Sequence, residues 1–68
     1  MNIGTIVKHF DADDPRAIRA YASLRAIVVA VSEDGARVRL QWACDKEPEP
    51  FFRHVNALLV ATDGADLF

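Results

Sequence analysis

The dipeptide Asp34-Gly35 lies between two apolar-rich segments that together span Ala26 to Cys44, and it constrains the fold more than any other feature. Aspartate followed by glycine between alternating segments is the strongest short-range signal of a β-hairpin. A type I′ turn needs positive φ at both central residues, which these two residue types tolerate best. The chain is therefore predicted to fold around a hairpin whose turn is Asp34-Gly35.

The turn also predicts a register for the hairpin. Counting outward from a two-residue turn sets Val31 opposite Val38 and Ile27 opposite Trp42, whereas a three-residue loop would set Val31 against Arg37 and mix the two faces. In the two-residue register the core face carries Ile27, Val29, Val31, Val38, Leu40 and Trp42, and the other face carries Val28, Ala30, Arg37, Arg39 and Gln41.

Length and composition predict one small folded domain over residues 1–68, with residues 62–68 as a short C-terminal tail. Hydrophobic residues make up 51% of the chain and charged residues 26%, which is typical of a globular domain. Cys44 is the single cysteine, so no disulfide within the chain is expected. No signal peptide is recognised, and the longest apolar run, Ala26 to Val31, is too short to cross a membrane. We expect a cytoplasmic protein without membrane association, and the arginine and alanine bias indicates a bacterial or phage gene.

The rest of the chain predicts further short elements around the hairpin. Asp14 suits a helix N-cap and Pro15 suits the first helical position, which predicts a short helix from Pro15 to about Leu24. Two prolines between Asp45 and Pro50 indicate a surface loop. We also expect a strand over Thr5–Phe10, an extended segment over Phe51–His54, a 3₁₀-like turn over Val55–Ala57 and a last strand over Leu58–Ala61.

This order of elements resembles the SH3-like small β-barrels of SH3, Tudor and KOW-type domains. The resemblance rests on the opening strand 4–8, the central segments 26–29 and 38–42, and the turn 54–58 before the last strand. It implies a mainly β fold, a five-stranded SH3-like barrel with one short helix in the first long loop. The helix is unusual for such a barrel, so the alternative is an α+β domain with one helix on a three- or four-stranded antiparallel sheet. Such barrels have many unrelated functions.

No residue pattern in the chain predicts catalysis. One cysteine and two separated histidines, Cys44, His9 and His54, do not form a zinc signature, so neither a metal nor a cofactor is expected. The loop carboxylates are interpreted as solvated charge rather than as an acid/base pair: Asp11, Asp13, Asp14, Glu47 and Glu49. The protein is therefore not expected to be an enzyme.

Two binding functions are compatible with the sequence. Adjacent Phe51 and Phe52 would point to opposite faces of a strand, so one of them would leave the interior and offer apolar surface to a partner. The predicted function is a small non-catalytic accessory protein that binds a protein partner or self-associates. Arginines on one face of the third strand favour the alternative, a weak nucleic-acid-binding domain of the KOW or Tudor type, although the net charge is −2. The candidate partner-binding residues are Arg37, Arg39, Gln41, Phe51, Phe52 and Arg53.

Overall fold

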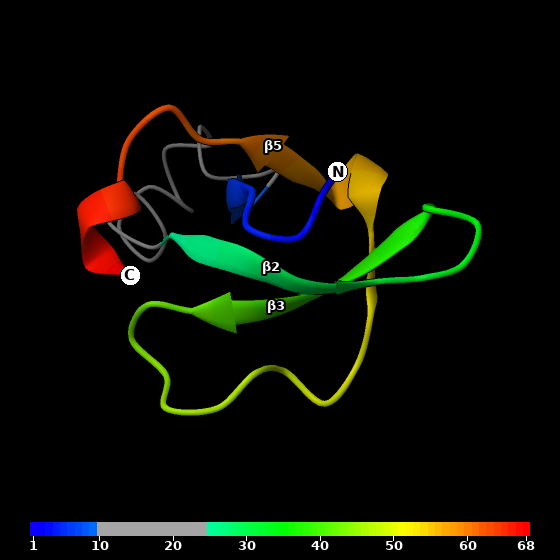
Figure 1. The fold of residues 1–68 in the computed structure, drawn as a ribbon, viewed down its shortest axis with the longest axis horizontal. Helices are drawn as coiled ribbons and strands as arrows, with labels where there is room; N and C mark the ends of the chain where they lie inside the picture. The colour runs from blue at the N-terminus through cyan, green and yellow to red at the C-terminus, as the bar shows by residue number, and fades with distance from the viewer. Residues whose placement is uncertain (10–24) are drawn as a thin grey trace.

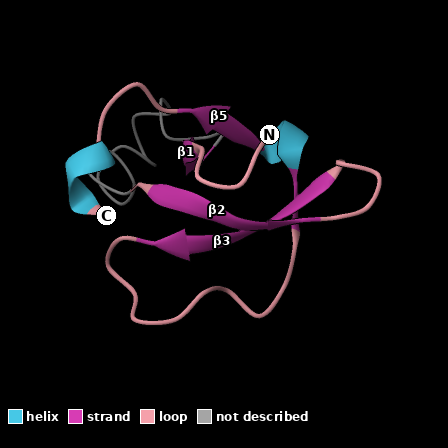
Figure 2. Cartoon of the chain, in the orientation of Figure 1, coloured by secondary structure: helices cyan, strands magenta, loops and turns pink. Residues whose placement is uncertain are grey.

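A computed structural model of the protein describes residues 1–9 and 25–68. The described residues form one antiparallel sheet that curls into a half-barrel, with strand order β4-β3-β2-β1-β5 (Figures 1 and 2). The predicted mainly β fold is confirmed, and the curled sheet is compatible with a small SH3-like barrel. The strands are β1 (Ile6–His9), β2 (Ala26–Val31), β3 (Arg37–Trp42), β4 (Arg53–His54) and β5 (Leu58–Val60).

The helical content of the described residues consists of two 3₁₀ turns. The turn η2 (Val55–Ala57) is where the sequence predicted it, and η3 (Ala65–Leu67) lies within the C-terminal tail. The predicted helix from Pro15 to Leu24 lies outside the described residues. The segment expected to be extended over Phe51–His54 contributes only its last two residues to the sheet, so both phenylalanines precede β4.

The hairpin turn lies where it was predicted but is not of type I′. Gly35 has φ +72°, whereas Asp34 has no positive φ, and type I′ requires positive φ at both. The Gly35 N–H donates to the Ser32 carbonyl (2.9 Å), and the Asp34 carboxylate accepts from the Ser32 hydroxyl (2.7 Å) and the Ala36 N–H (2.9 Å). These hydrogen bonds lower the pKa of Asp34. The side chain of Asp34 therefore stabilises a wider loop than the two-residue turn that was expected.

A β-bulge at Val29 makes half of the predicted register wrong. Val31 pairs with Val38 as expected, but the register shifts between Val28 and Ala30, and Val28 then pairs with Leu40. Because side chains alternate with a period of two, one extra residue exchanges the faces of everything beyond it. Ile27 consequently pairs with Gln41, and Ala26 takes the place opposite Trp42.

The bulge decides which valine of β2 enters the core. Val28 is 1% exposed and Val29 is 37% exposed, the reverse of the sequence prediction. On the side of β1, the Val28 N–H donates to the Thr5 carbonyl (3.0 Å) and the Val28 carbonyl accepts from the Gly4 N–H (2.8 Å). Backbone hydrogen bonds thus hold Val28 in its buried position. Among the described residues, the buried core consists of Val7, Ala26, Val28, Val38, Leu40, Trp42 and Leu58, so Ile27 and Val29 were wrongly assigned to it.

The C-terminal tail is attached to the start of β2. Arg25 donates from Nε to Oδ1 of Asp63 (2.8 Å) and from Nη2 to Oδ2 (3.2 Å), and this ion pair lowers the pKa of Asp63. Gly64 follows with φ +93°, and a Cβ atom there would lie 2.6 Å from Cγ of Arg25. The glycine therefore allows the backbone to approach Arg25 closely.

The bulge predicts unequal effects for the same substitution at two adjacent valines. Val28→Thr buries a hydroxyl and should lower the free energy of unfolding by about 1–3 kcal/mol, because burying a polar group without a hydrogen-bond partner is costly. Val29→Thr should change it by less than about 0.5 kcal/mol, because the side chain is exposed. Urea denaturation of the two variants compares them directly, and a larger loss for Val29→Thr would contradict the observed register.

Candidate functional site

The loop that connects β3 to β4 is fastened to β3 through the backbone of Glu49. The Glu49 N–H donates to the Leu40 carbonyl (2.8 Å), and the Glu49 carbonyl accepts from Nε of Arg39 (2.5 Å). At the other end of the loop, Nε2 of Gln41 donates to the Asp45 carbonyl (2.6 Å). Side chains from the outer face of β3 thus hold both ends of a loop that crosses beside the hairpin (Figure 1).

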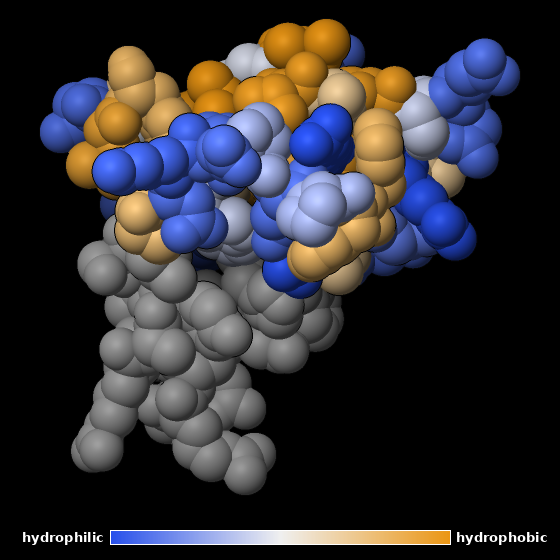
Figure 3. All heavy atoms as spheres, turned by 90° about the horizontal axis from the view of Figure 1, so that it is seen from below, coloured by the Kyte–Doolittle hydropathy of each residue, from blue (hydrophilic) through white to orange (hydrophobic). Residues whose placement is uncertain are grey.

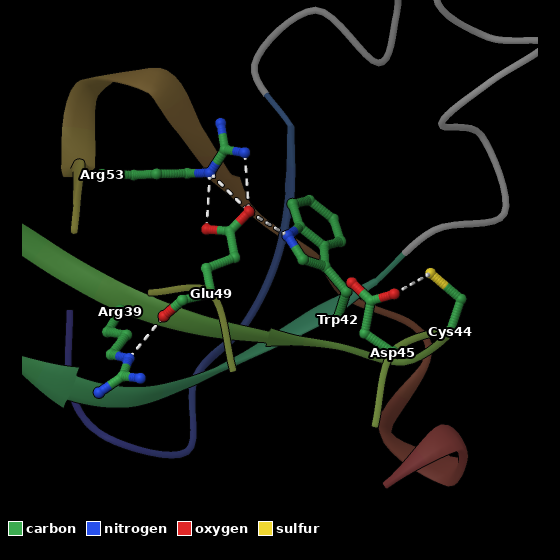
Figure 4. Close-up of polar contacts among 6 residues, drawn as sticks. All are labelled: Arg39, Trp42, Cys44, Asp45, Glu49 and Arg53. Carbon is green, nitrogen blue, oxygen red and sulfur yellow. Dashed lines mark hydrogen bonds and ion pairs between the residues drawn. The ribbon is translucent and has the colours of Figure 1, made fainter. Parts of the chain in front are cut away.

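The carboxylate of Glu49 joins β3 to β4. It accepts from the indole Nε1 of Trp42 (2.6 Å) and from Nη2 (2.7 Å) and Nε (2.9 Å) of Arg53 (Figure 4). The Glu49 side chain is only 10% exposed. Removing a carboxylate from solvent is costly unless hydrogen bonds replace those to water, and the indole and guanidinium donors supply such bonds.

The guanidinium of Arg53 also contacts two aromatic rings. Its Cζ atom lies 5.9 Å from the centroid of Trp42 and 5.2 Å from that of Phe51, both within the range of a cation–π interaction. Trp42 on β3, Glu49 in the loop, and Phe51 and Arg53 at the entry to β4 therefore form one assembly, which we call the Glu49 cluster.

The structure places five of the six predicted site residues at two locations, and the sixth, Phe52, immediately precedes β4. Phe51 and Arg53 belong to the Glu49 cluster, whereas Arg37, Arg39 and Gln41 alternate with buried residues of β3 and lie on its outer face. Arg39 and Gln41 each hold the loop through one hydrogen bond, as described above.

Glu49 is the residue that sequence reasoning misjudged, because it was interpreted as solvated charge. The only sequence signal for its role is its position between Pro48 and Pro50, since each proline fixes its own φ and narrows the loop's conformations. A charged loop rich in proline is normally solvated, so the pattern alone does not identify a buried carboxylate.

Arg37 and His54 face each other across β3 and β4. The register pairs their Cα atoms, and the Val55 N–H donates to the Ala36 carbonyl (3.0 Å) beside them. This bond places the Arg37–His54 pair at a non-hydrogen-bonded position of the ladder, where opposing side chains lie closest. Phe52 lies between Phe51 and Arg53 in sequence, immediately before β4 and two residues before His54. We call Arg37, Arg39, Phe52 and His54 the cationic face.

His54 has a defined ring orientation. Its Nδ1 accepts the Asn56 N–H (3.2 Å) at the start of η2, so in the neutral ring the proton is on Nε2. The imidazole is exposed, and Nε2 is directed away from this local contact. His54 thus offers a hydrogen-bond donor next to Arg37.

Exposed apolar side chains are numerous for a small domain. Phe51 is 50% exposed and Phe52 is 44% exposed, immediately before the edge strand β4. In a view of the loop side of the molecule, apolar atoms gather along the upper border, and others lie among hydrophilic groups (Figure 3). The other large exposed apolar residues within 1–9 and 25–68 are Ile3, Val29, Val60, Leu67 and Phe68.

Residues 1–9 and 25–68 contain no group of three or more histidine, cysteine or carboxylate side chains that could hold a metal ion. Cys44 is exposed and its thiol lies 3.9 Å from Oδ1 of Asp45. Within the same ranges, no helix has the length and apolar character needed to span a membrane.

Comparison of the chain with protein-family models, with curated proteins and with solved structures gives no match.

The Glu49 cluster predicts a large difference between two neighbouring carboxylates. Glu49→Gln removes the charge that Arg53 and Trp42 contact and should lower the free energy of unfolding by about 1–3 kcal/mol. Glu47→Gln, two residues away on an exposed side chain, should change it by less than about 0.5 kcal/mol. Urea denaturation followed by the fluorescence of Trp42, the single tryptophan, measures both. Equal stabilities for the two variants would mean that the cluster does not form.

Proposed function

We propose that the protein is a small non-catalytic, SH3-like interaction module that binds a protein partner through Phe51 and Phe52. The observation that supports this function is the exposure of both aromatic rings, 50% and 44%, beside a structured cluster. Large aromatic side chains supply most of the binding energy in many protein interfaces, and exposed apolar surface on a small domain is typical of a binding site.

The Glu49 cluster supports the proposal because it restricts the segment that carries the rings. Phe51 packs on Arg53, and Arg53 is itself held by the carboxylate of Glu49. Binding to an already ordered segment avoids part of the entropy that a flexible loop would lose on association. The segment 49–53 therefore resembles a preorganised anchor rather than a solvated linker.

The charge distribution favours a protein over a nucleic acid as the partner. The chain has a net charge of −2, and acidic residues stand on both sides of the arginines of β3 in sequence: Glu33 and Asp34 before them, Asp45 and Glu47 after them. Nucleic-acid-binding domains normally present an extended basic surface, because affinity comes largely from neutralising phosphates. The short basic segment that contains Arg37 and Arg39 suits a single acidic group better than a chain of phosphates.

A pair of variants tests the proposed function. Phe52→Ser should weaken capture of a specific partner from a cell lysate by about tenfold or more, since hot-spot truncations cost roughly 2 kcal/mol. Val60→Ser removes an exposed apolar side chain from β5, at the opposite edge of the sheet, and should leave capture unchanged. Quantitative mass spectrometry of the bound fractions gives the ratio for each protein.

Light scattering of the isolated wild-type chain measures its mass and so shows whether the partner is a second copy of the chain. A dimer that Phe52→Ser dissociates and Val60→Ser preserves would place a second copy on the same surface. If the wild type is a monomer and captures no protein in preference to Phe52→Ser, the proposed function is wrong.

A further inference from the structure

We infer that Arg37 and His54 bind a carboxylate on the partner, while Phe52 packs against an apolar side chain next to that carboxylate. The inference rests on the proposed function and specifies its ligand: an extended peptide segment in which an acidic residue adjoins an apolar one. It follows from the cationic face, whose four residues come from two paired strands and the residue that precedes β4.

The first step is that the register places two side chains with hydrogen-bond donors at directly opposed positions of neighbouring strands. Arg37 and His54 are Cα partners at a non-hydrogen-bonded position, where Cβ atoms are about 4.5–5.5 Å apart. The guanidinium is a planar fork of donors that matches both oxygens of a carboxylate. The Nε2–H of His54 adds a donor from the neighbouring strand, fixed by the bond that Nδ1 accepts from Asn56.

The second step is that these donors are not consumed by the part of the chain that the structure describes. Within residues 1–9 and 25–68, the guanidinium of Arg37 donates no hydrogen bond, and neither does Nε2 of His54. Both residues are exposed. Arg39, two positions along the same face, donates from Nε to the Glu49 carbonyl, and its Nη atoms are directed away from that carbonyl (Figure 4). A third set of donors therefore adjoins the pair.

The third step concerns the apolar neighbour. Phe52 is 44% exposed and immediately precedes β4, two residues before His54 in sequence. An aromatic ring near Arg37 and the Nε2–H donor of His54 fits a ligand in which a carboxylate and an apolar group are adjacent. A phosphodiester backbone carries repeated charge, and Asp34 already interacts electrostatically with Arg37 at one end of this face. Repulsion by that carboxylate disfavours a long polyanion more than a single acidic side chain.

Two matched peptides test the inference. One is an acetylated and amidated eight-residue peptide that alternates glutamate with leucine, and the other has glutamine in place of every glutamate. Titration of the ¹⁵N-labelled full chain should show shifts centred on Arg37, Phe52 and His54, with the glutamate peptide bound about tenfold or more tightly. Arg37→Ala and His54→Ala should each reduce that preference by roughly tenfold. Lys46→Ala removes the same unit of charge from an exposed loop position and should leave the preference unchanged.

Three results would overturn the inference. They are equal affinity for the two peptides, an equal loss in Lys46→Ala and Arg37→Ala, and tighter binding of a twelve-nucleotide single strand whose affinity falls steeply with salt. Chemical-shift spectra of the free variants establish that each one folds. If Phe52→Ser loses its protein partner while Arg37→Ala and His54→Ala keep it at full affinity, the carboxylate site is wrong and the proposed function stands.

Discussion

The carboxylate of Glu49 is the group on which the β3–β4 side of the molecule depends. It joins the indole of Trp42 in the core to the guanidinium of Arg53 on the edge strand. The backbone of Glu49 donates to the Leu40 carbonyl and accepts from the Arg39 side chain. Removing one partner of such a shielded contact leaves the other group unsatisfied, and the cost then exceeds the gain that the intact contact provides. A loop that is charged in composition is thereby made part of the packed structure.

The bulge at Val29 is the second feature that organises the sheet. It brings Val28 into the core and leaves Val29 outside, while the register nearer the turn is unchanged. The outer face of β3 keeps its alternation, because the extra residue lies in β2. The positions of Arg37 and Arg39 were therefore predictable even though the partners of the neighbouring strand were not.

The parts of the fold that the sequence predicted are those with a local cause. The hairpin position follows from Asp34-Gly35, and the 3₁₀ turn at Val55–Ala57 and the last strand follow from short local patterns. The bulge had no such cause, because Val28 and Val29 are the same residue type and either could fill the core. In the structure, Val28 is the buried valine, and its backbone is hydrogen-bonded to Gly4 and Thr5, more than twenty positions earlier in the chain.

In the candidate site, too, the sequence predicted the features that have a local cause and missed the others. Alternation on β3 correctly placed Arg37, Arg39 and Gln41 on one face. The sequence expected only one of the adjacent phenylalanines to leave the interior, whereas both are exposed and both precede β4. The sequence did not predict that Arg53 is held by Glu49 and stacked on two rings, nor that His54 opposes Arg37. Those relations depend on how the loop returns to β3, which no local pattern specifies.

Hydrogen exchange at the indole Nε1–H of Trp42 tests most directly whether Glu49 fastens the loop. The N–H donates to the carboxylate at 2.6 Å, so its exchange requires the loop to open. The account predicts exchange at least about tenfold slower than that of a free indole under the same conditions, and loss of this protection in Glu49→Gln. Exchange of the wild-type indole at the rate of a free indole would contradict it, because the loop would then be open in solution.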